Sequence, residues 1–207
     1  MLFQSPDKPI ECKAVNTTAV LQTRNKDRAK HVARLLGGRG NCKDVTVISE
    51  NIPQPGGIVH GVLRIEGYTF GDSLALLWDA IAPVKEAYLS TLSLNERNSE
   101  MIEKWLQDGA RVTLSLSEFF VASDKAKIYQ KNILPLESLG LRVILDRVHA
   151  KIFAFDSAKG HVVVESSANL RSRSCIEQFT MFNDESVYQF HKQWLEGIGN
   201  GRDRETG

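Results

Sequence analysis

Two short polar stretches in the second half of the chain contain residue types that can do chemistry on a phosphate. The first, His149-Ala-Lys-Ile-Phe-Ala-Phe-Asp156, has the spacing H-x-K-x-x-x-x-D, and the second reads Ser166-Ser-Ala-Asn169. An imidazole can act as a nucleophile or as an acid and base near neutral pH. An ammonium group and nearby hydrogen-bond donors can hold phosphate oxygens. Together these residue types predict a phosphate site.

The residues around the two stretches favour strands that would bring them together. The aromatic Phe153 and Phe155 within the first stretch and the β-branched residues 162–164 before the second are typical of strands, and Asp156–Gly160 between them is typical of a turn. Because side chains alternate along a strand, His149 and Lys151 should project from one face. Ser167 and Asn169 have the same two-residue offset. A β-hairpin would therefore place these four side chains near one another.

This pattern resembles the HKD signature of the phospholipase D superfamily, H-x-K-x-x-x-x-D followed by G-S-x-N. Glu177 stands where that family usually carries a glutamate. The sequence departs from the family in two ways. Ser166 replaces the glycine, and nine residues separate Asp156 from Ser166, more than is usual. The longer spacing fits in a hairpin tip, whereas the side chain of Ser166 bears on how closely the backbone can approach a phosphate.

The resemblance implies an α/β fold with a mixed, mostly parallel sheet flanked by helices, and with the motif on the central strands. It covers roughly residues 68–196. The chain is accordingly divided into an unassigned N-terminal extension with a basic helix (1–66), a phospholipase D-like catalytic domain (67–196) and a flexible tail (197–207).

Hydrophobic periodicity predicts alternating helices and strands over most of the chain. Two of the strands, separated by a single helix, predict a βαβ unit with parallel strands. Strands are expected at 45–48, 59–65, 86–94, 111–117 and 141–145, and helices at 72–81, 98–106, 124–139 and 185–195. In the last helix, Val187, Phe190, Trp194 and Leu195 have core-facing spacing, and His191 is expected at the surface.

The resemblance also implies roles for the residues of the motif. Lys151 and Asn169 would hold the nonbridging oxygens of a phosphate, and Ser167 would bond near the phosphate or the histidine. Glu177 would orient the imidazole and stabilise its cation. Asp156 would support the hairpin. In this scheme lysines take the place of magnesium, and neither a metal nor another cofactor is expected.

Only one copy of the motif occurs in the 207 residues. The family uses two motifs that face one another across a pocket, so the resemblance implies a homodimer with a shared site on its two-fold axis. His149 would attack phosphorus to form a phosphohistidine. His149 of the partner subunit would protonate the leaving oxygen and then activate water.

Basic residues outside the motif are candidates for nucleic-acid binding. Seven Lys or Arg lie between residues 24 and 43, where apolar residues at helical spacing predict a basic amphipathic helix. Its Arg28, Lys30 and Arg34 would contact a phosphate backbone, or the helix is an ordinary solvated surface helix. Arg171 and Arg173 follow Asn169 and would contact flanking phosphates or be rim charges.

The composition is that of an ordinary globular protein, with a net charge of +1 and 42% hydrophobic residues. The three cysteines form no C-x-x-C pair and fit reduced thiols in the cytoplasm better than disulfides or a zinc site. The first residues lack the basic start and apolar core of a signal peptide, and no apolar run has the length of a membrane span.

These observations predict a cytoplasmic, metal-independent hydrolase of phosphodiester bonds, a nuclease that acts on DNA or RNA as a homodimer. The alternatives are a phospholipase D-type lipid phosphodiesterase and a catalytically silent nucleic-acid-binding module of the same fold. Lipid hydrolysis would favour an exposed apolar helix rich in Trp or Phe, which the sequence does not show. Because Ser166 replaces the family glycine, the catalytically silent module remains an alternative.

Overall fold

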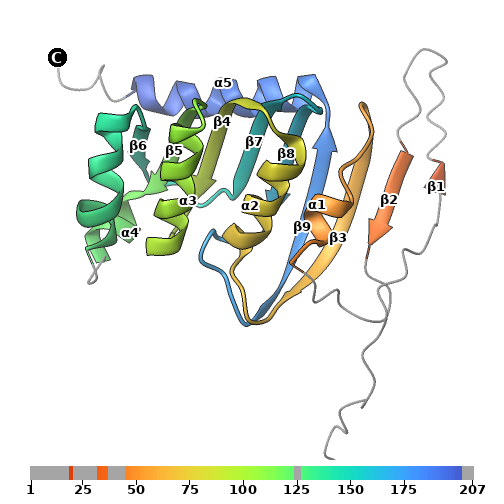
Figure 1. Ribbon diagram of the computed structural model, residues 1–207, viewed down its shortest axis with the longest axis horizontal. Helices are drawn as coiled ribbons and strands as arrows, with labels where there is room; N and C mark the ends of the chain where they lie inside the picture. The colour runs from red at the N-terminus through yellow and green to blue at the C-terminus, as the bar shows by residue number, and fades with distance from the viewer. Residues whose placement is uncertain (1–18, 21–31, 37–44, 124–126, 202–207) are drawn as a thin grey trace, which may run out of the picture.

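The computed structural model describes residues 19–20, 32–36, 45–123 and 127–201, which form one mixed sheet with helices on both faces (Figure 1). The sheet has nine strands in the order β1-β2-β3-β9-β8-β7-β4-β5-β6. The strands are β1 (Ala19–Val20), β2 (Val32–Leu36), β3 (Ile58–Ile65), β4 (Val84–Thr91), β5 (Arg111–Ser117), β6 (Arg142–Asp146), β7 (Ile152–Ser157), β8 (Gly160–Ser166) and β9 (Cys175–Asn183). The helices are α1 (Val47–Glu50), α2 (Phe70–Ile81), α3 (Glu96–Gln107), α4 (Glu118–Ser123), the π-helix η1 (Tyr129–Ile133), the 3₁₀-helix η2 (Leu134–Leu139) and α5 (Glu185–Gly201).

The predicted mixed α/β fold is confirmed, but most strand pairs are not parallel. β2–β3, β4–β5 and β5–β6 are parallel, whereas the other five neighbouring pairs are antiparallel. The predicted βαβ unit is β4-α3-β5. Four of the antiparallel pairs arise because the predicted hairpin, β7–β8, and then β9 lie in the middle of the sheet rather than at an edge, and the fifth is β1–β2.

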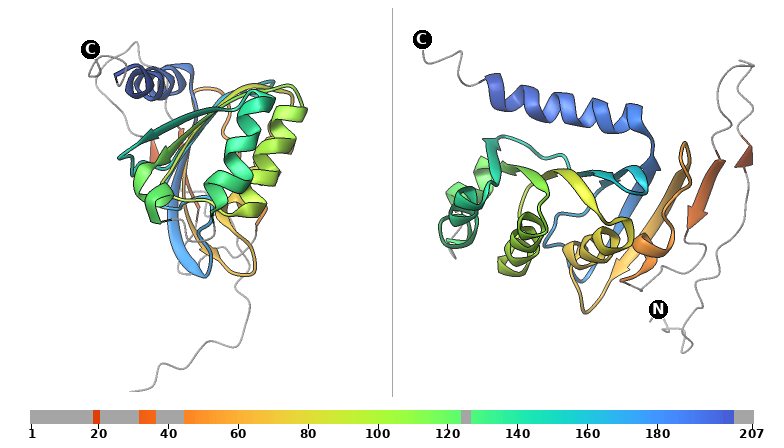
Figure 2. Two further views of the ribbon diagram at one scale, coloured as in Figure 1. Left: turned by 90° about the vertical axis from the view of Figure 1, so that its left-hand side faces the viewer. Right: turned by 45° about the horizontal axis from the view of Figure 1, so that its top comes forward.

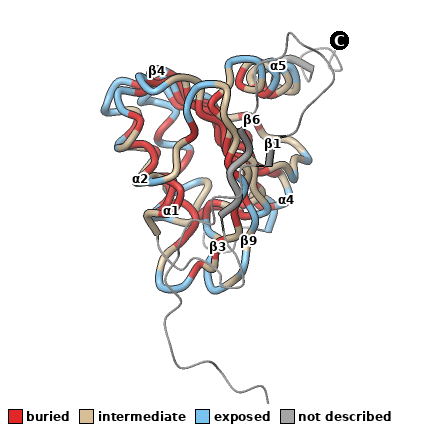
Figure 3. Tube along the Cα trace, turned by 90° about the vertical axis from the view of Figure 1, so that its right-hand side faces the viewer, coloured by how far each residue is buried: buried red, intermediate tan, exposed pale blue. Residues whose placement is uncertain are grey.

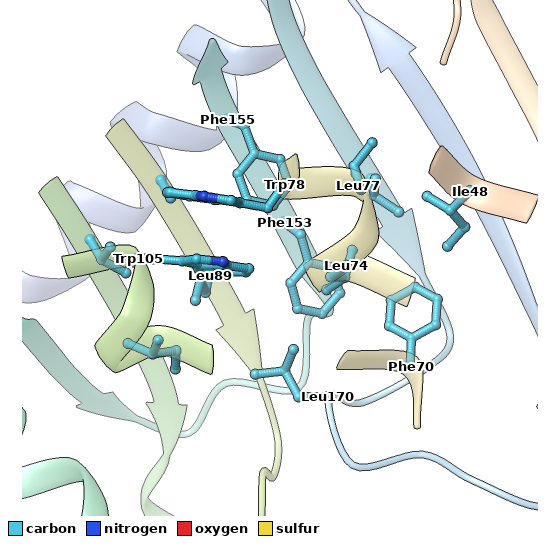
Figure 4. Packing of buried hydrophobic residues seen from close by; sticks show 14 of the residues in the cluster. Ile48, Phe70, Leu74, Leu77, Trp78, Leu89, Trp105, Phe153, Phe155 and Leu170 are labelled. Atoms are coloured by element: carbon cyan, nitrogen blue, oxygen red, sulfur yellow. The ribbon is translucent and has the colours of Figure 1, made fainter. Parts of the chain in front are cut away.

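The sheet separates two hydrophobic layers. α2 and α3 lie on one face, and α5 alone runs across the other (Figure 2). In the larger core, the indole rings of Trp78 and Trp105 stack at a centroid distance of 4.4 Å, and Phe155 meets both rings edge-on (Figure 4). A smaller cluster under α5 contains Tyr88 and Tyr188. Figure 3 shows the buried residues concentrated in the sheet between these helix layers.

Capping boxes determine where the two long helices of the larger layer begin. The hydroxyl of Thr69 accepts from the amide of Asp72, whose carboxylate accepts from the amide of Thr69 at 2.7 Å. Asn95 and Asn98 make the same reciprocal pair at the start of α3. The sequence predicted helices from residues 72 and 98, whereas the helices begin two residues earlier, and Asp72 and Asn98 are their third residues.

Three predictions of secondary structure are corrected. Residues 45–48, expected as a strand, turn into the short helix α1 from Val47 onward. The helix expected at 124–139 is the irregular pair η1 and η2, because Pro135 cannot donate a backbone hydrogen bond. Within the basic segment 24–43, Val32–Leu36 is strand β2, paired in parallel with β3, and the remaining residues lie outside the described part.

The sheet extends beyond the boundary predicted at residue 66. β3 pairs with β9 along its whole length, and its inward side chains Val59, Leu63 and Ile65 belong to the larger core. At the other end, α5 continues through Gly201, past the boundary predicted at 196. No helix in the described ranges is both long and apolar enough to cross a membrane.

Candidate active site

Four neighbouring strands bring the predicted site residues to one edge of the sheet. This edge is formed by the ends of strands and not by an outermost strand. β4 and β8 end at this edge, while β7 and β9 begin there, because each is antiparallel to its neighbour in the order β9-β8-β7-β4. The segment that leads into β7 is fixed by two hydrogen bonds. Ser90 Oγ donates to the carbonyl of Ala150 at 3.0 Å, and the amide of Ser166 donates to the carbonyl of Lys151 at 3.0 Å.

His149 and Lys151 lie just before β7 and touch one another. The imidazole is exposed, whereas Lys151 is 8% exposed beneath it. Lys151 Nζ lies 3.0 Å from His149 Nδ1 and 3.2 Å from Nε2, and it donates to the carbonyl of His149 at 2.6 Å. Burial lowers the pKa of the Lys151 ammonium, and the nearby charge of Glu177 opposes that shift. The pair thus presents an exposed imidazole over a buried cation.

Ser167 and Glu177 form a second contact pair across the turn from β8 to β9. The hydroxyl of Ser167 donates to Glu177 Oε2 and accepts from the amide of Gln178 at 3.0 Å. Cys175 Sγ, 3.4 Å away, donates to the other oxygen of Glu177. Burial raises the pKa of the Cys175 thiol, and the hydrogen bond and charge of Glu177 raise it further. The thiol is therefore a proton donor to this carboxylate.

The expected hydrogen bond between Glu177 and the imidazole is absent from the described residues. The carboxylate accepts from Ser167 and Cys175 instead, and the imidazole contacts Lys151. Glu177 nevertheless acts on the site through its charge, which favours the ammonium form of Lys151.

Among the residues that the structure describes, only the oxygen end of the Asn169 side-chain amide is held by hydrogen bonds. Its Oδ1 accepts from the amide of Leu92 at 3.0 Å and from Thr91 Oγ1 at 3.4 Å, both at the end of β4. Both donors reach the oxygen, so the Nδ2 group points the other way and can donate to a ligand. The backbone amide of Asn169 donates a further hydrogen bond to Ser172 Oγ at 3.0 Å.

The side chain of Ser166 takes part in the turn between β8 and β9. Its Oγ donates to the carbonyl of Gln178 at 2.7 Å and accepts from the amide of Ala168 at 3.0 Å. The extra atoms relative to glycine thus make two hydrogen bonds within the protein.

Asp156 lies at the far end of the hairpin. It pairs with His161 across the β7–β8 ladder, with 3.8 Å between Asp156 Oδ1 and His161 Nε2. Asp156 is five residue steps along the strand from Lys151, a distance of about 17 Å. This place suits the predicted support of the hairpin and excludes contact with a phosphate held at His149.

A groove of about 560 Å³ opens beside Asn169. One wall is the segment after β4, and the other is the loop between β8 and β9. The lining residues are Leu92, Ser93, Asn95, Asn169, Arg171, Ser172, Arg173 and Cys175. Arg171 and Arg173 therefore lie beside Asn169, and their contact with nucleic acid stays a prediction. Arg28 and Lys30 lie outside the described residues, and Arg34 lies in β2, where only the backbone is described.

Sequence reasoning missed the contributions of Thr91, Leu92 and Cys175. The end of a buried strand followed by Leu92-Ser-Leu-Asn95 was a signal for the first two, because ligands often lie beyond the carboxyl ends of strands. The two-residue offset between Cys175 and Glu177 was a signal for the third, since it places both on one face of β9. Within the described ranges, no three His, Cys, Asp or Glu side chains are grouped so that they could hold a metal ion.

Comparisons with solved structures identify this architecture. A phospholipase D family member, Nuc from Salmonella typhimurium, superposes with a TM-score of 0.51 at 15% identity, over 68% of this chain and 95% of that one. Polyphosphate kinase from Porphyromonas gingivalis and phosphatidylserine synthase from Haemophilus influenzae each give a TM-score of 0.49, at 19% and 15% identity. They match 67% and 68% of this chain, which spans only 24% and 38% of theirs. No protein-family model and no curated protein matches the sequence. The Nuc superposition shows that the chain has the phospholipase D fold.

Proposed function

We propose that the protein is a metal-independent phosphodiesterase that cleaves nucleic acid through a phosphohistidine intermediate. The observation that carries this proposal is the buried ammonium of Lys151 against the exposed imidazole of His149, with 3.0 Å between Nζ and Nδ1. An ammonium can only donate, so the imidazole nitrogen facing it presents a lone pair. A phosphate bound here would take over the ammonium protons and leave the imidazole nitrogen free to attack.

The reaction has two displacements at phosphorus. In the first, an imidazole nitrogen of His149 forms a bond to phosphorus as the bond to the leaving oxygen breaks, and that oxygen takes a proton from a second imidazole. In the second, the now neutral second imidazole takes a proton from water, whose oxygen displaces His149. The products are a phosphomonoester and an alcohol, and both imidazoles return to their starting states.

The remaining site residues stabilise charge that develops on the phosphate. Lys151 and the Nδ2 group of Asn169 would hold the nonbridging oxygens. Glu177 would favour the ammonium form of Lys151, because its charge opposes the lowering of the lysine pKa by burial. Ser167 would position the Glu177 carboxylate, to which its hydroxyl is bonded.

The second imidazole in this proposal is His149 of the partner subunit. A two-fold axis brings the same residue of two copies face to face, and His149 is exposed at the sheet edge as such an arrangement needs. The active unit would then be a homodimer with one site.

Nucleic acid is favoured over lipid because the groove beside Asn169 is polar and carries two arginines. Arg171 and Arg173 line this groove, and guanidinium groups bind phosphates bidentately. A substrate with repeated phosphates would use both the site and the groove, whereas a lipid headgroup would use only the site.

Substrate assays in EDTA test the proposal. Plasmid, single-stranded DNA, RNA and phosphatidylcholine vesicles would be incubated with the wild type and with His149→Ala, with Phe190→Ala on α5 as a matched surface control. We expect nucleic acid to be cleaved in EDTA by the wild type and by Phe190→Ala but not by His149→Ala. Loss of cleavage on chelation refutes the metal-free reaction, and sole cleavage of phosphatidylcholine refutes the substrate class. Full activity of a sedimentation-verified monomer refutes the shared site.

A further inference from the structure

Two aromatic side chains lie at the same edge of the sheet as the site. α4 begins directly after β5, and the last residues of β5 pair with the end of β4, with Leu116 opposite Thr91. This helix carries Phe119, which is 58% exposed, and Phe120, which is 7% exposed and belongs to the larger core. More than half of the Phe119 surface at this edge is thus open to solvent.

Each of these rings is paired with an arginine. The guanidinium carbon of Arg147 lies 5.8 Å from the centroid of Phe119, and its Nε donates to Glu118 at 2.7 Å. The guanidinium carbon of Arg171 lies 5.6 Å from the centroid of Phe120. Arg147 precedes His149 by two residues, and Arg171 lines the groove beside Asn169. One ring–guanidinium pair thus involves the segment that precedes His149, and the other involves an arginine of the groove.

The arginines of the groove extend from a loop that is firmly held. The amides of Phe70 and Gly71 donate to the carbonyls of Ser172 and Leu170 at 3.0 and 2.9 Å, and the amide of Leu170 donates to Thr91 Oγ1 at 3.2 Å. Among the described residues, neither Arg171 nor Arg173 forms an ion pair with a carboxylate. Their charge is therefore available to an anionic ligand.

A row of flat side chains next to a cationic groove suits a strand of nucleic acid whose bases are free to stack. Bases stack on aromatic rings and on guanidinium planes, while the backbone follows the positive charge. In a duplex the bases are already stacked on one another and paired, so they could not use this surface.

We propose that the site selects single-stranded nucleic acid, with a base beside the scissile phosphate stacked on Phe119 and the next phosphates held by Arg171 and Arg173. This inference rests on the proposed function, since it takes the phosphate at His149 as its origin. Phe119 then determines strand preference, and the two arginines determine how steeply binding depends on salt.

The test measures binding without turnover, with the His149→Ala background and a fluorescent twelve-nucleotide thymidine oligonucleotide or a twelve-base-pair duplex. We expect tighter binding of the single strand. Phe119→Ala should weaken single-strand binding about tenfold, since stacking on an aromatic ring accounts for roughly that factor or more. Phe190→Ala, which removes a phenylalanine 63% exposed on α5, should change nothing.

Salt dependence tests the arginines separately. Arg173→Ala should lower the slope of log affinity against log salt by about 0.7, the amount expected for one lost single-strand phosphate contact. Arg142→Ala is the matched control, because this exposed arginine begins β6 at the opposite edge of the sheet. An unchanged slope in Arg173→Ala would overturn the assignment of phosphate binding to the groove.

Four other outcomes would overturn the inference. They are equal affinity for single strand and duplex, equal binding by Phe119→Ala and Phe190→Ala, preference for anionic lipid vesicles, and dissociation of the dimer by Phe119→Ala. The last would assign Phe119 to the subunit contact. Hydrolysis of bis(p-nitrophenyl) phosphate by the wild type reports on the proposed function alone, so its failure is distinguishable from failure of the strand preference.

Discussion

The two ends of the Asn169 amide have separable tasks, so Asn169→Asp should abolish activity without unfolding the protein. The aspartate retains an oxygen that accepts from the amide of Leu92 at 3.0 Å and from Thr91 Oγ1. The same change replaces the Nδ2 donor with a second carboxylate oxygen, which repels a phosphate. The anchor to β4 is kept, and the donor to the ligand is lost.

The size of each effect follows from these contacts. Loss of one donor to an oxyanion costs about 3 kcal/mol in the transition state, or roughly 10²- to 10³-fold in kcat, and repulsion adds to it. Asn169→Ala instead leaves the amide of Leu92 without its acceptor, which costs about 1–3 kcal/mol of stability. We therefore expect Asn169→Asp to be stable and inactive, and Asn169→Ala to be both unstable and inactive.

Two measurements check this prediction. Urea unfolding should give wild-type stability for Asn169→Asp to within about 1 kcal/mol and a clear loss for Asn169→Ala. Hydrolysis of bis(p-nitrophenyl) phosphate should fall at least a hundredfold in both. If Asn169→Asp keeps more than a tenth of wild-type activity, Nδ2 does not hold the phosphate. If it is as unstable as Asn169→Ala, the division of the amide into two tasks is wrong.

Two further predictions concern Ser166 and α5. Ser166→Gly restores the family glycine but removes two hydrogen bonds of the β8–β9 turn, so it should lower the free energy of unfolding by about 1–3 kcal/mol and change kcat less than fivefold. A large gain in kcat would show instead that the serine side chain obstructs the phosphate. Burial raises the pKa of Glu86, yet hydrogen bonds from Lys192 and Tyr188 and the charges of Lys192 and Arg111 outweigh it, so the folded-state pKa lies below the usual 4.5. The bonds to Glu86 therefore stabilise the protein fully above about pH 4.5 and are lost as the pH falls through the lower folded-state value. Glu86→Gln should lower stability at pH 7 by about 2–4 kcal/mol and flatten its acid dependence, as measured by urea unfolding from pH 3 to pH 7. If the free energy of unfolding depends on pH in the same way in Glu86→Gln and the wild type, α5 is held by contacts other than those of Tyr188 and Lys192 with Glu86.

The central hairpin and the approach of His149 to Lys151 could be predicted because their signals are local. Asp156–Gly160 is typical of a turn, and the bond between Ser157 Oγ and the carbonyl of Gly160 at 2.8 Å closes it. A two-residue spacing on an extended chain keeps two side chains on one side, and here they are in contact.

Contacts between distant segments could not be predicted in the same way. The anchor of Asn169 is a backbone amide 77 residues earlier, and a backbone group leaves no mark in the sequence. The pairing of β3 with β9 likewise joins residues more than a hundred positions apart. The boundary at residue 66 followed the extent of the motif resemblance, which does not include such a partner strand.

The buried face of α5 was misassigned because polar pairs can replace apolar contacts. His191 was expected at the surface but is 5% exposed, with Nε2 2.8 Å from Glu165 Oε1. The indole of Trp194 donates to His191 Nδ1 at 2.9 Å, which makes Nε2 the donor to Glu165. Phe190, expected in the core, is 63% exposed. Hydrophobic spacing alone does not distinguish a face that buries a satisfied histidine from one that exposes a phenylalanine.

The central claim is that the imidazole of His149 becomes bonded to phosphorus. The most direct measurement is mass spectrometry of peptides from enzyme mixed with a radiolabelled phosphodiester and quenched in alkali within a turnover, where a phosphoramidate survives. We predict a phosphoryl adduct on the peptide that carries His149, formed and lost at rates consistent with turnover, and absent from His149→Ala. An enzyme that turns over while His149 stays unmodified at every time point would contradict the account.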